Sequence, residues 1–219
     1  MASFLQVKNL THIYSAGTPF EHKALDSVSF CVERGEFIGI IGHTGSGKST
    51  LIQHLNGLIK PTSGKIFVGG EDLWANPKDI RRFRFKVGLV FQYPEHQLFE
   101  ETVRKDIAFG PKNMGLSDEE IEERVIEAAK HTGLTEDYLE KSPFDLSGGE
   151  KRKVAIAGVL ASNPSVIIMD EPTSGLDPVT RSEMLDVFWD YIQDENNTIF
   201  ISSHITSDLE RIADTITFI

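Results

Sequence analysis

The chain has 219 residues, 40% hydrophobic and 25% charged, which is typical of a globular protein with a sizeable core. Its formal net charge of −11 argues against a protein that grips nucleic acid through bulk electrostatics. The single cysteine, Cys31, excludes a disulfide within the chain, and we expect it to be a buried, small apolar residue in a reducing compartment.

The first third of the chain has strand patterns. Residues 4–13 and 28–32 alternate apolar and polar side chains, which predicts two half-buried strands around a hairpin-like loop, SAGTPFEHK. The apolar run FIGIIG (37–42) predicts a buried strand that leads through a Gly-rich loop into a helix over Ser49–Leu58. KIFVGGEDL and KVGLVFQ (86–92) predict two further strands.

Charged, helical patterns dominate from Pro94 to about Leu146. In SDEEIEERVIEAAKHTGL, Ser117 and Glu120 fit a capping box. The apolar stripe of this helix consists of Ile121, Val125, Ala128 and Ala129. SVIIMDEP, TIFISSH and TITFI then predict three more strands. Strands that alternate with helices indicate an α/β fold with a mostly parallel sheet, into which the helical segment is inserted.

A Gly-rich loop follows the FIGIIG strand. Its sequence, GHTGSGKS, fits the pattern G-x-x-x-x-G-K-[ST] of a P-loop, in which successive backbone N–H groups face a phosphate. Lys48 is expected to reach the β- and γ-phosphates, and Ser49 to bind Mg²⁺. The predicted nucleotide-binding residues of this segment are Gly42, His43, Thr44, Gly45, Ser46, Gly47, Lys48, Ser49 and Thr50.

Two carboxylates end the strand VIIMD, which matches a Walker B pattern. We expect Asp170 to hold Mg²⁺, directly or through water, and Glu171 to polarise the attacking water. Gln92 and His204 also end predicted strands. Alone they are ordinary polar strand-end residues, but in this order they predict contacts to Mg²⁺ or the attacking water for Gln92 and to the γ-phosphate for His204.

A second helix start, LSGGEKRKVAIAGVL, also offers N–H groups to an anion. It lies about a hundred residues after the P-loop, and we expect it to be too distant to share the same ATP. Two chains placed head to tail would sandwich each ATP between one P-loop and the opposite Ser147, Gly148 and Gly149. The γ-phosphate would then join the two subunits, and its hydrolysis would loosen them.

The order of these motifs resembles that of an ABC ATPase over the whole chain. The resemblance implies one domain over 1–219, with a β-subdomain and RecA-like P-loop core in 1–92 and 150–219 and a helical subdomain in 93–149. It further implies that Tyr14 stacks on adenine, the alternative being a buried strand tyrosine. Asp177, in SGLD, would run along the dimer interface.

A finer resemblance covers roughly residues 1–162. Stretches such as GHTGSGKSTLIQHLNGLIKPTSG and LSGGEKRKVAIAGVLA are similar to the ATPase subunits of energy-coupling factor transporters, which import vitamins and transition-metal ions such as cobalt and nickel. Residues 163–219 look more like multidrug-type or sodium-type exporter ATPases, which suggests a mosaic chain. Family members usually continue beyond the segment that matches TITFI, so we expect weak dimerisation without nucleotide.

The resemblance therefore implies an ATPase that drives a separate membrane subunit through its coupling helix, as a homodimer or a heterodimer with a related ATPase. The expected location is the cytoplasmic face of the cell membrane, peripherally, because the sequence has no signal peptide and no apolar run of about 18 residues. The alternatives are an exporter ATPase, a soluble ABC protein of DNA repair or translation, and a regulatory cassette without turnover. The basic stretch KDIRRFRFK (78–86) is interpreted as solvated.

Overall fold

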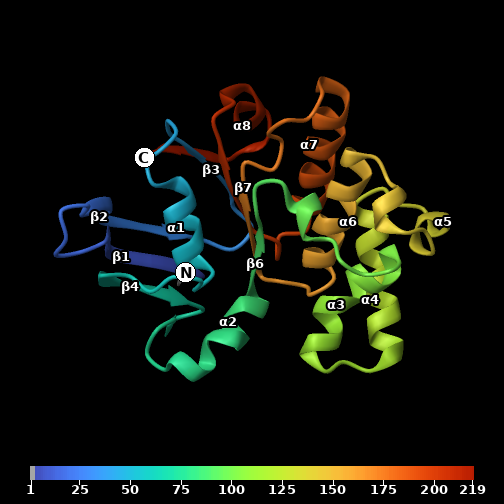
Figure 1. Cartoon of the computed structure of the whole chain (residues 1–219), viewed down its shortest axis with the longest axis horizontal. Helices are drawn as coiled ribbons and strands as arrows, with labels where there is room; N and C mark the ends of the chain where they lie inside the picture. Colours follow the sequence, from blue (N-terminus) through green and yellow to red (C-terminus); the bar gives the residue numbers. More distant parts are fainter. Residues whose placement is uncertain (1–2) are drawn as a thin grey trace.

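Two β-sheets lie side by side in the computed structural model, which describes residues 3–219 (Figure 1). The first sheet is antiparallel, and its strand order is β2-β1-β4-β5. Its strands are β1 (Leu5–Tyr14), β2 (His22–Val32), β4 (Ser63–Val68) and β5 (Glu71–Asp72). The predicted hairpin is confirmed, although β2 begins six residues before the expected strand.

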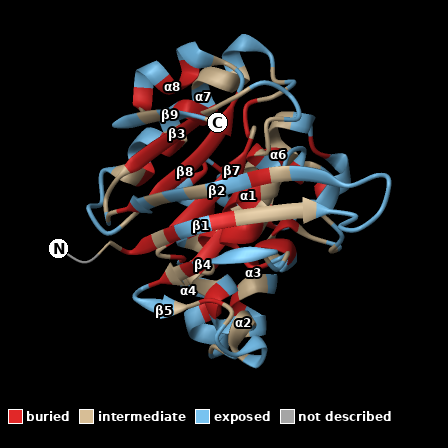
Figure 2. Cartoon of the chain, turned by 90° about the vertical axis from the view of Figure 1, so that its left-hand side faces the viewer, coloured by how far each residue is buried: buried red, intermediate tan, exposed pale blue. Residues whose placement is uncertain are grey.

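The second sheet is parallel throughout, in the order β6-β7-β8-β3-β9. Its strands are β3 (Phe37–Ile41), β6 (Val87–Val90), β7 (Val166–Asp170), β8 (Ile199–Ser203) and β9 (Thr215–Phe218). All five were predicted from the sequence, the first four of them from apolar runs. Figure 2 shows the buried strands of this sheet behind β1 and β2.

The parallel sheet has a hydrophobic core on each face, because successive strand residues point to opposite sides. In β7, Val166 and Ile168 pack toward the antiparallel sheet and α1, whereas Ile167 and Met169 pack toward the helices on the other face. In β8, Phe200 points to the first core and Ile201 to the second. These runs are therefore apolar without alternation.

The helices lie in three groups around this sheet (Figure 1). Helix α1 (Lys48–Leu55) belongs to the core shared with the antiparallel sheet, and α7 (Pro178–Ile192) and α8 (Thr206–Ile212) cover the other face. The helical group consists of α3 (Val103–Met114), α4 (Asp118–His131), α5 (Glu136–Leu139) and α6 (Gly148–Leu160). Short 3₁₀ turns occur at η1 (Pro77–Asp79), η2 (Pro94–Gln97) and η3 (Pro143–Asp145).

Local sequence explains most helix boundaries. The capping box predicted at Ser117 and Glu120 starts α4, and all four residues of its predicted apolar stripe are buried. Helix α1 starts one residue earlier than expected and ends at Leu55, because Gly57 takes a left-handed backbone (φ 69°) that stops the helix.

One expectation outside the site is wrong. Cys31 is exposed, because it lies on the outward side of β2, an edge strand, while its neighbours Phe30 and Val32 point inward. The basic stretch before β6 has mostly exposed basic side chains, as interpreted, but it also forms helix α2 (Ile80–Lys86), which was not predicted and which buries Phe83.

Candidate functional site

The P-loop joins the carboxyl end of β3 to the start of α1. Gly47 has a left-handed backbone (φ 100°), and a Cβ atom there would lie 2.5 Å from the carbonyl oxygen of Ala24. Only glycine fits that position. The Lys48 ammonium donates to the carbonyls of Gly42 (2.7 Å) and His43 (3.1 Å) within the same loop. The loop thus holds a nearly buried cation beside its own N–H groups.

The two strand-end carboxylates have different surroundings. Asp170 is buried and accepts a hydrogen bond of 2.6 Å from the hydroxyl of Ser202 on the neighbouring strand β8. Glu171 has a left-handed backbone (φ 48°), and its N–H donates to the carbonyl oxygen of Ser202 at 3.1 Å. The turn at Glu171 separates the two side chains, so that Asp170 is fixed by the sheet and Glu171 faces the P-loop.

Three predicted site residues converge on Glu171. Its carboxylate accepts from the Gln92 amide at 3.2 Å and lies 3.2 Å from Nδ1 of His204. The Lys48 ammonium is 3.9 Å from the other carboxylate oxygen. Because an ionised carboxylate can only accept, Nδ1 of His204 carries the proton in this contact. Gln92, Glu171 and His204 all follow the carboxyl ends of parallel strands, where α/β sheets bind ligands.

A cavity of about 300 Å³ opens in front of these groups. Tyr14 and His22, from the facing ends of β1 and β2, line one side of it, and Gln92 and Glu171 line another. Tyr14 is 40% exposed, so the alternative of a buried strand tyrosine is excluded. The P-loop residues that line the cavity are Thr44, Gly45, Gly47, Lys48, Ser49 and Thr50.

The donor set at this cavity suits a magnesium ion held together with phosphates. Ser49 and Gln92 line the cavity and offer oxygen ligands, and Asp170, the residue before the cavity-lining Glu171, adds a carboxylate at the end of β7. Within residues 3–219 no group of three or more His, Cys, Asp or Glu side chains is arranged to hold a metal. Mg²⁺ is usually held by one or two carboxylates together with substrate phosphates and water.

The second predicted phosphate site, at the start of α6, is built differently. Ser147 caps the helix, and its hydroxyl donates to Glu150 at 2.6 Å while its N–H donates to the same carboxylate at 2.8 Å. These bonds from Ser147, with one from the Tyr138 hydroxyl, lower the pKa of Glu150 to about 2. Ser147 and Gly148 are exposed on the surface.

The two glycines after Ser147 have different reasons to be there. A Cβ atom on Gly149 would lie 2.8 Å from Cγ2 of Thr180 in α7, so packing within the chain requires glycine. A Cβ atom on Gly148 would meet nothing within 4 Å. Gly148 therefore leaves room for something outside the chain.

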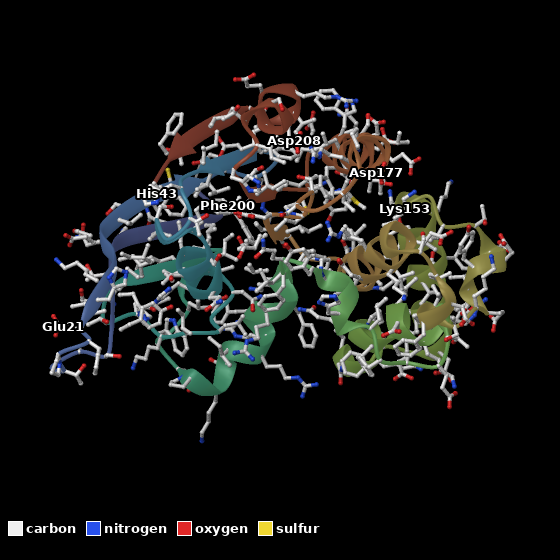
Figure 3. All side chains as sticks on the ribbon, turned by 45° about the horizontal axis from the view of Figure 1, so that its top comes forward. Glu21, His43, Lys153, Asp177, Phe200 and Asp208 are labelled. Carbon is white, nitrogen blue, oxygen red and sulfur yellow. The ribbon has the colours of Figure 1, made fainter. Side chains whose placement is uncertain are left out.

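Asp177 caps α7, a role that the sequence analysis did not assign. Its carboxylate accepts from the N–H groups of Val179 (3.0 Å) and Thr180 (3.2 Å) and from the Thr180 hydroxyl (2.6 Å). The Thr180 bonds above all lower the pKa of Asp177. Figure 3 shows Asp177 and Lys153 of α6 on one side of the molecule and His43 of the P-loop well apart from both. The two phosphate sites of one chain therefore lie apart, as expected.

Arg152 is the main site residue that sequence reasoning missed. It is 2% exposed, and its guanidinium contacts both carboxylate oxygens of Glu95 in η2 at 2.8 and 3.0 Å. It also donates to the carbonyls of Pro172 and Ser174, both at 2.9 Å. Arg152 thus joins α6 to the segments after Gln92 and Glu171. Its spacing of four residues from buried Ile156 could have revealed it.

Comparison with known proteins agrees with this arrangement. The model of a family described as "ABC transporter" matches residues 25–174. The chain belongs to this family. An energy-coupling factor transporter ATP-binding protein, EcfA2 of Clostridioides difficile, is 56% identical over 96% of this chain and 73% of its own length. The chain is therefore an ABC ATPase, which binds and hydrolyses ATP.

Solved structures of ABC ATPases share the fold. CbiO1 from Clostridium perfringens, described as part of the ABC transporter complex CbiONQ, has a TM-score of 0.89 and 39% identity over 100% of this chain and 85% of its own. A dimeric ATP-binding cassette, MJ0796 with ADP and phosphate bound, has a TM-score of 0.86 and 29% identity over 98% of this chain and 94% of its own. The predicted ABC ATPase fold is thus confirmed.

The mosaic origin expected for residues 163–219 finds no support. The match to EcfA2 covers 211 of the 219 residues and so extends through this part of the ABC ATPase. A single kind of relative therefore accounts for both halves, and the exporter-like interpretation is dropped. Among the helices of residues 3–219, none has the length and apolar character that crossing a membrane requires.

Proposed function

We propose that this ABC ATPase hydrolyses MgATP as one half of the motor of an energy-coupling factor transporter, with Glu171 as the general base. The observation that carries the proposal is the convergence of Lys48, Gln92 and His204 on Glu171 beside the P-loop cavity. A carboxylate held this way, 18% exposed and beside a cation, suits the activation of one water molecule.

The other site residues organise phosphate and metal in this proposal. The N–H groups of residues 42–50 cradle the phosphates, and Lys48 neutralises charge on the β- and γ-phosphates. Ser49, Gln92 and Asp170 would hold Mg²⁺, which would offset negative charge on the phosphates. The Nδ1–H of His204 donates to Glu171, and a hydrogen bond from Nε2 to the γ-phosphate would require the imidazolium form, in which Nε2 also carries a hydrogen. Tyr14 stacks on adenine.

The active unit in this proposal is a head-to-tail dimer. The exposed Ser147 and the open space at Gly148 support binding of a partner's γ-phosphate at the start of α6. Asp177, exposed at the start of α7, lies where the two subunits meet. Both faces are supplied by this fold, so a homodimer is possible in geometry, and a heterodimer with a related ATPase is the arrangement that the transporter class favours.

The membrane partner docks beside the segment that follows Gln92. Phe99 and Phe109 are 57% and 46% exposed and meet edge to face, with ring centroids 4.9 Å apart. Such an exposed aromatic pair is suited to receive a coupling helix. The ATPase would then sit peripherally at the cytoplasmic face of the membrane, and the transported solute would be a vitamin or a transition-metal ion selected by the membrane components.

We also propose that the chain divides into a helical subdomain and a β-subdomain with its RecA-like core. Residues 93–149 form the helical subdomain, and residues 1–92 and 150–219 form the β-subdomain and RecA-like core. The boundary at residue 149 falls in the first turn of α6 (Gly148–Leu160), so this helix extends from the phosphate-contacting start into the core. Movement of the helical part would therefore be transmitted along α6.

The test is the molar mass in solution of Glu171→Gln with and without MgATP. Without the general base, ATP is bound but not hydrolysed, and we expect the mass to double only when MgATP is present. Glu171→Gln combined with Lys48→Ala is the control and should stay monomeric, because it lacks the phosphate-binding cation. A variant that binds ATP but remains a monomer would contradict the homodimer and require a different partner chain.

A further inference from the structure

Two histidines connect Tyr14 to the P-loop helix. The ring of His12, two residues before Tyr14 on β1, meets the Tyr14 ring edge to face, with centroids 4.4 Å apart at 76°. The ring of His54, on α1, lies 4.6 Å from that of His12 at 69°. His54 is completely buried, and His12 is half-buried.

The hydrogen bonds of this chain fix the protons on both rings. Nδ1 of His54 lies 2.7 Å from the carbonyl oxygen of Thr50, which can only accept, so Nδ1 carries a proton. Burial lowers the pKa of His54 to about 4, which keeps the ring neutral near pH 7 and leaves Nε2 as an acceptor. The contact of 3.1 Å between Nε2 of His54 and Nδ1 of His12 is therefore donated by His12.

Thr50 closes the connection on its other side. Its hydroxyl lies 3.2 Å from the Tyr14 hydroxyl, while its carbonyl anchors His54. Tyr14 is thus tied to the P-loop helix at its hydroxyl and, through His12 and His54, at the edge of its ring. The pairing of β1 with β2 shifts register between His12 and Ile13, an irregularity that re-aims strand side chains.

We propose that His12 and His54 are positioning residues that hold the Tyr14 ring ready for adenine. This inference rests on the proposed stacking role of Tyr14. A ring fixed before binding loses little freedom when the base arrives, so the affinity for ATP gains while the phosphate contacts are unchanged. The histidines therefore favour ligands that carry a base over bare polyphosphate.

The test compares the affinities of ATP and inorganic tripolyphosphate for the full chain, with His12→Ala as the main variant. His12 is chosen because it is only half-buried, whereas His54 is a core residue. We expect His12→Ala to weaken ATP binding by about 3- to 10-fold, the value of one aromatic edge contact, and to leave tripolyphosphate binding unchanged. KM for ATP should rise by the same factor, with kcat changed by less than about twofold.

Two further variants decide whether the effect passes through Tyr14. His12→Phe keeps the ring contact and should recover part of the affinity for ATP. In a Tyr14→Ala background, His12→Ala should cause no further loss, because nothing remains to be positioned. His54→Asn, whose shorter side chain keeps a donor near Thr50 but places no acceptor at the position of Nε2, should move the ATP affinity in the same direction as His12→Ala.

Two outcomes would overturn the inference while leaving the proposed function intact. One is an equal loss of ATP and tripolyphosphate affinity in His12→Ala, which would mean general damage to the P-loop. The other is a full additional loss on top of Tyr14→Ala. If Tyr14→Ala itself leaves ATP affinity unchanged, the stacking role of Tyr14 fails and this inference fails with it.

Discussion

Helices α1 and α6 both begin at glycine-containing turns, but the groups that surround the two helix starts differ. At α1, the P-loop and the buried Lys48 line a cavity, and Glu171 lies 3.9 Å from the ammonium group of this lysine. At α6, the helix start is exposed, and its nearest charged group is its own capping carboxylate, Glu150. The start of α1 therefore has a cation and a cavity beside its N–H groups, whereas the start of α6 lies at the surface beside a carboxylate.

The difference shows how a protein can make its assembly depend on its ligand. Every helix leaves the N–H groups of its first turn without internal acceptors. At α1 the fold supplies everything else that a phosphate needs. At α6 the capping box occupies the N–H groups of Ser147 and Glu150, and a phosphate brought by a second chain would complete the site. Each ATP would then contact the P-loop of one chain and the start of α6 of the other.

The largest expected effect comes from breaking the complete site. Lys48→Ala removes the cation that lies 2.7 Å from the Gly42 carbonyl and 3.9 Å from Glu171. We expect ATP turnover to fall by about 10²- to 10³-fold, as when a preorganised donor to the transition state is lost. Steady-state phosphate release at saturating ATP measures this. A fall of less than about tenfold would show that the P-loop amides suffice without the lysine.

The next prediction concerns the link between the two sites. Arg152→Ala removes the ion-pair partner of Glu95 and the hydrogen-bond donor to two carbonyls. The free energy of unfolding should therefore drop by about 3 to 5 kcal/mol. Urea unfolding followed by circular dichroism measures it. Replacing both partners, as Glu95→Gln with Arg152→Met, should recover part of that stability, because no unpaired charge remains. A loss below about 0.5 kcal/mol in the single variant would rule out a structural link.

A matched pair of capping boxes sharpens the comparison further. Ser147 starts α6 and Ser117 starts α4 with the same reciprocal bonds to a glutamate three residues on. Each Ser→Ala change should cost about 1 kcal/mol of stability. Only Ser147→Ala should also lower ATP turnover, because only that helix start is proposed to meet a phosphate. Equal turnover in the two variants would argue that the start of α6 has no part in the reaction.

The smallest expected effect is a dependence of stability on pH. Bonds from Ser147 and Tyr138 lower the pKa of Glu150 from 4.5 to about 2, so the ionised carboxylate stabilises the folded state. That contribution is fully present above about pH 4.5 and is lost as the pH falls toward 2. Between about pH 4.5 and pH 2, the free energy of unfolding of Glu150→Gln should change less than that of the unchanged protein. Identical pH profiles for the two proteins would contradict the depressed pKa.

Much of the fold follows from short, continuous patterns. Four strands of the parallel sheet lie in apolar runs, whereas β9 alternates threonine with Ile216 and Phe218, and the P-loop and α4 each carry their signals within a few neighbouring residues. The order of the motifs assigned Gln92 and His204 to the site, but their convergence on Glu171 was not predicted; it arises because parallel strands bring their carboxyl ends together. The roles of these residues in catalysis stay predictions.

The parts that the sequence did not reveal depend on pairs of distant residues. Arg152 meets Glu95 from 57 positions away, and His54 meets His12 from 42. No pattern within a short stretch of sequence predicts such a pair. Cys31 was misplaced because residue type alone does not say which side of an edge strand faces outward. The mosaic interpretation failed because it compared short stretches by appearance.

The left-handed backbone at Glu171 has a consequence for the stability of this chain. A non-glycine residue at φ 48° costs about 1 kcal/mol that glycine would not, so Glu171→Gly should yield a sturdier protein. It would also delete the carboxylate on which three side chains converge. Glutamate at this position therefore places a carboxylate beside the P-loop at the expense of backbone stability.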